Sequence, residues 1–268
     1  MNTVKVILLG DVVGETGRKL LRKNLPLFKE LYKPDLIIVN GENSAHGKGI
    51  TPKIAEEWQE LGVDVITTGN HVWDKQEIIP YLKEHTHVLR PANYPEGCPG
   101  VGVTTITKNG HTFGVINVIG RVFMGMHGDC PFRKVEELVT ELRKETPLIF
   151  VDFHAEATSE KLGMGYFLEG KVSAVVGTHT HIQTADARIL PGGTAYITDL
   201  GMAGSLNSMI GVTKDPILNR FLYQMPQRHE VAVDAPFVMS GVVVTVDAQT
   251  GKALKIESIY KVDEDPLD

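Results

Sequence analysis

Cysteine is scarce in this chain, and so is any long apolar run. Only Cys98 and Cys130 occur among the 268 residues, and they form no C-x-x-C pair, which argues against a disulfide framework and a thiolate zinc site. No apolar stretch reaches the roughly eighteen residues of a membrane helix, and the N-terminal one is too short for a signal peptide. We therefore expect a soluble cytoplasmic protein with no membrane contact.

An excess of positive charge is also missing. Lysine and arginine together number 27, aspartate and glutamate 33, and the formal net charge is -6. Duplex nucleic acid is therefore not an expected partner, whereas a small phosphorylated ligand is compatible with this balance. Repeats, low-complexity tracts and Ser/Gly linkers are absent from the sequence as well, so we expect a single domain over residues 1–268.

What the chain does have is an alternation of strand and helix patterns. Short runs rich in β-branched residues predict buried strands at 4–9, 35–40, 64–68, 148–153 and 172–176. Apolar residues at helical spacing predict helices at 15–32, 52–61, 75–83, 135–144 and 159–168. We expect Pro26 to kink or divide the first helix, and Thr51 and Gly62 to begin and end the second.

The remaining strands are predicted outside these units. Asn109-Gly110 lies between apolar runs at 101–107 and 112–118, the pattern of a hairpin with a type I′ turn. Further strands are expected at 182–190, 194–198, 237–247 and 253–262. Strand–helix units at the start and antiparallel strands at the end predict an α/β fold of four layers. In this αββα sandwich, two mixed sheets lie face to face with helices outside.

The strongest functional motif is Gly177-Thr178-His179-Thr180-His181, which follows a predicted buried strand. In an extended backbone, residues two apart project to the same face, so the imidazoles of His179 and His181 would point together where the strand ends. Paired neutral imidazoles are typical metal ligands. The similar pair His85 and His87 follows a helix pattern, so we expect those side chains to be exposed or to cap that helix.

Other predicted strand ends also carry residues of metal-ligand type. They are Asp11 after Gly10, Glu42 and Asn43 after Gly41, Asn70 and His71 after Gly69, and the pair Asp152 and His154. Each residue alone is more often part of a turn or a hydrogen bond. Because ligands bind beyond the carboxyl ends of parallel strands, their recurrence at successive strand ends predicts one metal site at a sheet edge.

This set of motifs resembles that of the calcineurin-like binuclear metallophosphoesterases. It is more closely similar to their YmdB-type branch, which comprises cyclic-nucleotide phosphodiesterases. The resemblance runs from residue 9 to residue 181 and includes the segments 90–95 and 120–124. Two motifs depart from the broad superfamily. Asp11 is not followed two positions later by histidine, and Glu42 stands where aspartate is usual.

The resemblance implies two metal ions per chain, with Glu42 bridging them and Asn43 replacing the missing histidine. One ion would bind Asp11, Glu42, Asn43 and His181, and the other Glu42, Asn70, His154 and His179. These nitrogen and oxygen donors favour iron or manganese, with zinc as an alternative. His71 would stand beside the site without binding metal.

The implied reaction is hydrolysis of a cyclic nucleotide, most closely a 2′,3′-cyclic nucleotide. A hydroxide bridging the ions would attack phosphorus, and His71 would donate a proton to the departing alkoxide. Asp152 and Glu156 are candidates to orient ligand imidazoles, and Arg90 and Arg121 to contact the substrate. Ordinary turn or surface roles are the alternative for these four residues.

Two other functions stay open at this point. The same cluster would serve a phosphomonoesterase or 5′-nucleotidase, because loop shape decides between monoesters and diesters. A regulatory module that binds a phosphorylated ligand with little turnover is the second alternative, although a proton donor at His71 argues against it. The apolar stretch 235–246 suits either a core strand or an interface strand, which leaves a homo-oligomer open.

Overall fold

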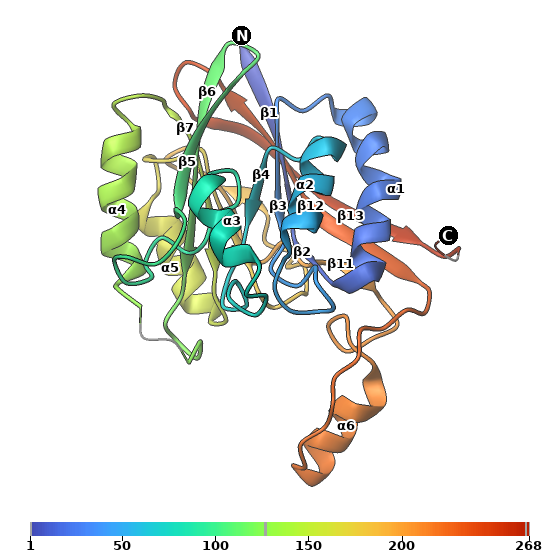
Figure 1. Cartoon of the computed structure of the whole chain (residues 1–268). Coiled ribbons are helices and arrows are strands. Elements are labelled where there is room, and N and C mark those ends of the chain that lie inside the picture. Colours follow the sequence, from blue (N-terminus) through green and yellow to red (C-terminus); the bar gives the residue numbers. More distant parts are fainter. Residues whose placement is uncertain (1, 126–127, 266, 268) are drawn as a thin grey trace.

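The computed structural model describes residues 2–125, 128–265 and 267. Over these residues the chain forms two mixed β-sheets that lie face to face, with helices on the outer side of each (Figure 1). This arrangement confirms the predicted α/β sandwich of four layers. None of the helices in the described ranges is long and apolar enough to cross a bilayer.

The first sheet contains the N-terminal strands and the last two strands of the chain. In the described residues it has seven strands, in the order β2-β11-β12-β1-β3-β4, with β13 paired to β12. The bounds are β1 (Thr3–Leu9), β2 (Asp11–Val12), β3 (Leu36–Asn40), β4 (Val65–Thr67), β11 (Met202–Ser205), β12 (Phe237–Asp247) and β13 (Ala253–Asp263). Because β1, β3 and β4 run parallel, their carboxyl ends lie at one edge.

The second sheet has six strands among the described residues, in the order β5-β6-β7-β8-β10-β9. They are β5 (Val103–Lys108), β6 (His111–Ile119), β7 (Leu148–His154), β8 (Ala174–Thr178), β9 (Arg188–Ile189) and β10 (Ala195–Ile197). The strands β6, β7, β8 and β10 run parallel. The predicted hairpin is confirmed, because Asn109 and Gly110 have the two positive φ angles, 54° and 79°, that a type I′ turn requires.

Large apolar clusters between and outside the sheets hold the layers together. Alternate residues of β1 illustrate this, since Val6 and Leu8 face the second sheet while Ile7 and Leu9 lie beneath the outer helices. The helices on the first sheet are α1 (Gly14–Tyr32), α2 (Pro52–Leu61) and α3 (Ile78–Glu84). The helices α4 (Pro131–Leu142) and α5 (Thr158–Phe167) cover the second sheet. Most helix predictions are thus confirmed within a few residues.

Pro26 was expected to kink or divide the first helix, and the structure contradicts the division. α1 continues through it, with Leu21, Leu25 and Phe28 buried against the sheet while Pro26 is exposed. Proline removes one backbone hydrogen bond, but here the carbonyl left without a partner belongs to the exposed Arg22 and can be hydrated. Burial of the opposite face therefore keeps the helix in one piece. Thr51 and Gly62 do begin and end α2 as predicted.

The predicted strand at 182–190 is also largely wrong, because only β9 forms there. Side chains in the segment before β9 form hydrogen bonds with backbone groups of other segments. The amide of Gln183 donates to the carbonyl oxygens of Gly241 and Ile259, and Asp186 accepts from the backbone of Thr198. The strands β2 and β11 and the helix α6 (Lys214–Tyr223) were not predicted. α6 projects from the body of the molecule, and none of its residues is buried (Figure 1).

Candidate active site

The residues predicted as metal ligands converge at one edge of the sandwich. They follow the carboxyl ends of five strands, β1, β3, β4, β7 and β8, and belong to both sheets. Those that are buried are Asp11, Glu42, Asn43 and His154, and those that are half-buried are Asn70, His179 and His181. We call these seven residues the strand-end cluster. Its members are up to 170 positions apart in sequence, so only the fold brings them together.

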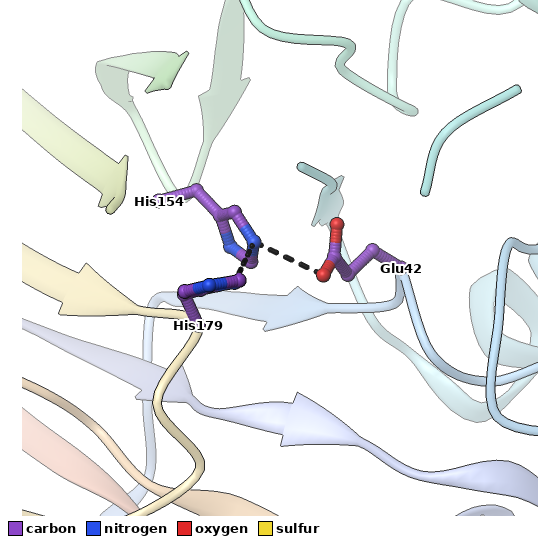
Figure 2. Close-up of side chains that lie close together, drawn as sticks. All are labelled: Glu42, His154 and His179. Carbon is purple, nitrogen blue, oxygen red and sulfur yellow. Dashed lines mark hydrogen bonds and ion pairs between the residues drawn. The ribbon is translucent and has the colours of Figure 1, made fainter. Parts of the chain in front are cut away.

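The ring nitrogen Nε2 of His154 is surrounded by other ligand atoms. Glu42 Oε1 lies 3.0 Å from it, Asn70 Oδ1 3.2 Å and His179 Nδ1 3.1 Å. Figure 2 shows Glu42, His154 and His179 pointing toward one another from three different segments. Two atoms that bind one ion at about 2.1 Å lie roughly 3 Å apart, so this spacing fits ligands of a shared cation.

Polar contacts on the far side of these rings fix which ring nitrogen of each faces the cluster. The hydroxyl of Thr178 donates to Asp152 Oδ1 over 2.7 Å, so it can only accept from His154 Nδ1, which is 2.9 Å away. His154 therefore turns Nε2 into the cluster, and this nitrogen offers a lone pair to a cation when the ring is neutral. His179 behaves alike, because its Nε2 lies 3.2 Å from the carboxylate of Glu156 and its Nδ1 faces His154.

A second group of acceptors lies around His181. Its Nδ1 donates to the carbonyl oxygen of Ile210 over 2.7 Å, which leaves the Nε2 lone pair facing Asn43 Oδ1 at 3.3 Å. The amide nitrogen of Asn43 donates to Gly47, so its oxygen has no proton to offer His181. Asp11 Oδ1 lies 3.8 Å from His181 Nε2 and, among the described residues, is buried without a hydrogen-bond partner. Such facing acceptors fit a cation between them.

The pKa values record the same crowding of acceptors. Burial alone would lower the pKa of His154, but Glu42 and Asp11 raise it to about 9. Burial raises the pKa of Asp11 to about 6 against the effect of its histidine neighbours. Burial and the neighbouring His154 lower the pKa of His179 to about 3. One proton on His154 thus offsets the acceptors in the protein alone, and a bound cation would take over that role.

Gly69 gives the cluster its compactness. A Cβ at this position would overlap both the imidazole of His154 and the carboxylate of Glu42. The glycine before Asn70 therefore allows the loop after β4 to approach the two ligand side chains, as close backbone approach generally requires.

His71 lies beside the cluster without entering it. Its backbone N–H donates to Glu42 Oε2 over 3.2 Å, and its ring Nδ1 lies 3.0 Å from Asp74 Oδ2. The ring is 25% exposed and lines the cavity in front of the cluster. Asp74, which was not predicted, therefore orients the imidazole of His71.

The other predicted neighbours of the cluster divide into two groups. Asp152 acts through Thr178, which bonds His154, and Glu156 contacts His179 directly. Arg90 instead donates to backbone carbonyl oxygens of residues 91, 98 and 99, so it holds that loop together. The backbone of Arg121 binds Glu160, and its side chain is exposed. A substrate contact by either arginine stays a prediction.

His85 and His87 are separate from the cluster, as expected. His85 ends α3 and stacks on Tyr81 with 3.8 Å between ring centroids, and His87 lies within 3.4 Å of the same tyrosine hydroxyl. Both rings contact this tyrosine and are half-buried rather than exposed, and the backbone of His85 caps α3 as one of the two expectations had it.

Two functional features gave no usable signal in the sequence. The first is a buried ion pair, in which Lys161 Nζ lies 2.6 Å from Asp199 Oδ2, and the same carboxylate accepts from the backbone of Thr180. This pair fixes the loop that carries His179 and His181. The second is a cavity of about 490 Å³ in front of the cluster, whose far wall comes from residues 210–233, which we call the α6 arm.

Solved structures define the class to which this fold belongs. The chain matches a crystal structure of a 5′-nucleotidase precursor from Thermus thermophilus with a TM-score of 0.56 and 16% identity, over 98% of this chain and 55% of that one. At this identity the likeness concerns the fold, which is that of the metallophosphoesterases. Together with the group formed by Glu42, His154 and His179, this fold implies bound metal ions.

Closer relatives define the family. The model of the YmdB-like protein family matches residues 7–259, and the chain belongs to that family. A 2′,3′-cyclic-nucleotide 2′-phosphodiesterase of Bacillus subtilis (strain 168) is 50% identical over 261 residues, which are 97% of this chain and 98% of that protein. A crystal structure of a novel phosphatase from Mycoplasma pneumoniae matches with a TM-score of 0.92 and 37% identity, over 99% and 96% of the two chains. The resemblance read from the motifs is thus confirmed.

Proposed function

We propose that this chain is a metal-dependent phosphodiesterase that hydrolyses cyclic nucleotides, with 2′,3′-cyclic nucleotides as its substrates. One observation carries the proposal. The inward ring nitrogens of His154 and His181 face carboxylate and amide oxygens, and that of His179 faces His154. The outward ring nitrogens already have partners in Thr178, Glu156 and Ile210. The activity for which the Bacillus subtilis relative is named, at 50% identity, supports the substrate class.

The two groups of contacts match two cation sites. Asp11, Asn43 and His181 would hold one ion, Asn70, His154 and His179 the other, and Glu42 would lie between them. Iron or manganese suits these donors best, and zinc is the alternative. When bound, such ions neutralise charge on phosphate oxygens and lower the pKa of water. With only two carboxylates in the set, the loaded cluster would be net positive and would attract a phosphate.

His71 is proposed as the general acid. Its position beside the cluster and its contact with Asp74 leave Nε2 directed away from the orienting carboxylate. An imidazole held in this orientation can deliver a proton from Nε2 to a departing alkoxide. Alkoxides leave poorly near neutral pH, so this proton is needed most for nucleotide substrates.

The general-acid role is tested by His71→Ala on two diesters. Turnover of a 2′,3′-cyclic nucleotide should fall by roughly 100-fold or more, while bis(4-nitrophenyl) phosphate, with its better leaving group, should lose far less. Metal content, measured by elemental analysis, should stay at the wild-type level. An equal loss of metal and activity would show instead that His71 is a ligand.

A phosphomonoesterase is the second candidate function, because the Mycoplasma pneumoniae relative is described as a phosphatase. The two candidates are separated by comparing a 2′,3′-cyclic nucleotide with nucleoside 5′- and 3′-monophosphates, before and after chelation. The proposal requires metal-dependent cleavage of the cyclic diester with little release of inorganic phosphate. Release of phosphate from the monoesters alone would favour the second candidate, and binding without product would favour a regulatory module.

Three wider expectations stay proposals as well. We propose a single domain over residues 1–268, since the inter-sheet core draws on both the first and the last strands. A small phosphorylated substrate, rather than duplex nucleic acid, fits the net charge of -6. The cytoplasmic location stays a prediction from the sequence.

A further inference from the structure

The cavity in front of the strand-end cluster has two unlike walls. One wall carries the polar side chains of Glu42, His71 and His179, and the other carries Ile217 and Phe221 of the α6 arm. Its volume of about 490 Å³ is typical of small-ligand sites. A phosphodiester bound at the strand-end cluster would fill only the polar side of this cavity. The arm would then face the remaining part of the substrate.

The aromatic ring of Phe221 is available to a ligand. Phe221 lines the cavity and yet is 68% exposed, and none of the residues of α6 is buried. Helices of globular proteins are normally held by packing an apolar face, and the face of α6 toward the cavity packs on nothing that buries it. A planar ligand stacked on Phe221 would cover this surface.

The charge of the arm also suits a nucleotide. Arg220 and His229 line the cavity together with Phe221. The same two side chains and Lys48 line an adjoining cavity of about 480 Å³. In a chain with a net charge of -6, the cationic side chains of Lys48 and Arg220 at this adjoining cavity favour an anionic ligand.

We propose that the α6 arm is the nucleoside-recognition element of this enzyme, and that Phe221 stacks on the base of the bound cyclic nucleotide. The inference rests on the proposed function, since it assumes that the phosphate lies at the strand-end cluster. Every base offers a π-face, so stacking on Phe221 predicts acceptance of purine and pyrimidine nucleotides alike, with the stronger stacking purines favoured. Such stacking on one aromatic side chain corresponds to roughly a tenfold gain in binding.

The test compares Phe221→Ala and Phe221→Trp with Leu222→Ala. Leu222 is the matched control, because it is 70% exposed on the same helix and is not among the residues that line the cavity. Each metal-loaded variant is assayed on 2′,3′-cyclic AMP and on glycerol 1,2-cyclic phosphate, which has the same five-membered diester but no base. Affinity for adenosine 3′-phosphate is measured by calorimetry, and the oligomeric mass by light scattering.

Phe221→Ala should raise KM for the cyclic nucleotide by roughly tenfold and weaken the binding of adenosine 3′-phosphate to a similar extent. The preference for the nucleotide over the base-free diester should fall accordingly, while Phe221→Trp restores it and Leu222→Ala behaves as wild type. An unchanged preference in Phe221→Ala would overturn the inference and leave the proposed function intact. The inference would also be overturned if Leu222→Ala lost the nucleotide preference equally, or if Phe221→Ala changed the oligomeric mass. Either result would show that the arm acts as an interface. Failure of the proposed function is distinct, because the wild-type protein would then cleave neither diester.

Discussion

The strand-end cluster and the α6 arm face the same cavity but are built in opposite ways. His154 and Glu42 are fully buried, and each cluster imidazole has a polar partner on its outer side, by a hydrogen bond for His154 and His181 and by contact with Glu156 for His179. Phe221 and Leu222 of the arm are 68% and 70% exposed, on a helix that buries none of its residues. One wall of the cavity is therefore buried and polar, whereas the other is exposed and combines apolar side chains with Arg220 and His229.

This difference separates what each wall can contribute. Preorganised, buried donor atoms can hold charge at fixed positions, which is what chemistry at phosphorus requires. An exposed helix contributes contact area, and its side chains can change with little effect on the fold. The two regions are thus expected to respond very differently to the same kinds of substitution.

The largest effect is expected from Glu42→Gln in the cluster. This change keeps the volume of the side chain but removes one of the two carboxylate charges available to bound ions. Metal content should fall, and turnover of a 2′,3′-cyclic nucleotide should drop by roughly 1,000-fold, because metal ions contribute several kcal/mol to such reactions. Elemental analysis and steady-state kinetics measure both, with the exposed Glu60→Gln as control. Wild-type metal content in Glu42→Gln would contradict the assignment.

The next largest effect is expected at the ion pair behind the histidine loop. Lys161→Ala leaves the carboxylate of Asp199 buried without its cation. Breaking a buried pair in this way costs about 3–5 kcal/mol, so the free energy of unfolding should fall by that amount. Urea denaturation measures it, and the exposed Lys53→Ala serves as control. A change below about 1 kcal/mol would show that the pair does not hold this loop in place.

The cluster could be predicted from the sequence because its residues share one simple rule. Each follows a buried strand, and parallel strands bring their carboxyl ends together, so Asp11 and His179 could be placed at one edge despite the distance between them in sequence. The four-layer arrangement was predictable for another reason. Apolar residues recur with different periods in strands and helices, so the order of these elements could be read from the sequence.

The surroundings of the cluster follow no such rule. Lys161 and Asp199 meet through tertiary packing, and neither has a neighbour in sequence that reveals the other. Thr178 lies inside the recognised motif, but its role depends on a hydroxyl proton directed to Asp152. The α6 arm has exposed apolar residues without a periodic buried face, so the pattern that reveals packed helices is weak there.

A smaller effect is expected from Thr178→Val, which removes a hydroxyl outside the cluster. His154 Nδ1 would lose its acceptor, and Asp152 would lose a donor. Metal affinity should fall by about 10–100-fold, because groups that orient a ligand imidazole usually contribute this much. Competition with a chelator measures it, and Thr105→Val on the exposed side of β5 is the control. Unchanged affinity would mean that His154 is held by packing alone.

The smallest effect is expected from Leu222→Ala on the stability of the arm. The side chain is 70% exposed, so its loss should change the free energy of unfolding by less than about 0.5 kcal/mol. Leu25→Ala in α1, where the leucine is fully buried, should cost about 2–5 kcal/mol for the same loss of atoms. Urea denaturation of both variants at several protein concentrations gives the contrast. A loss in Leu222→Ala that approaches that of Leu25→Ala, and that grows with protein concentration, would show that the arm packs against a second copy of the chain. If Leu222→Ala is as stable as the wild type at every protein concentration, the arm is free to bind a ligand.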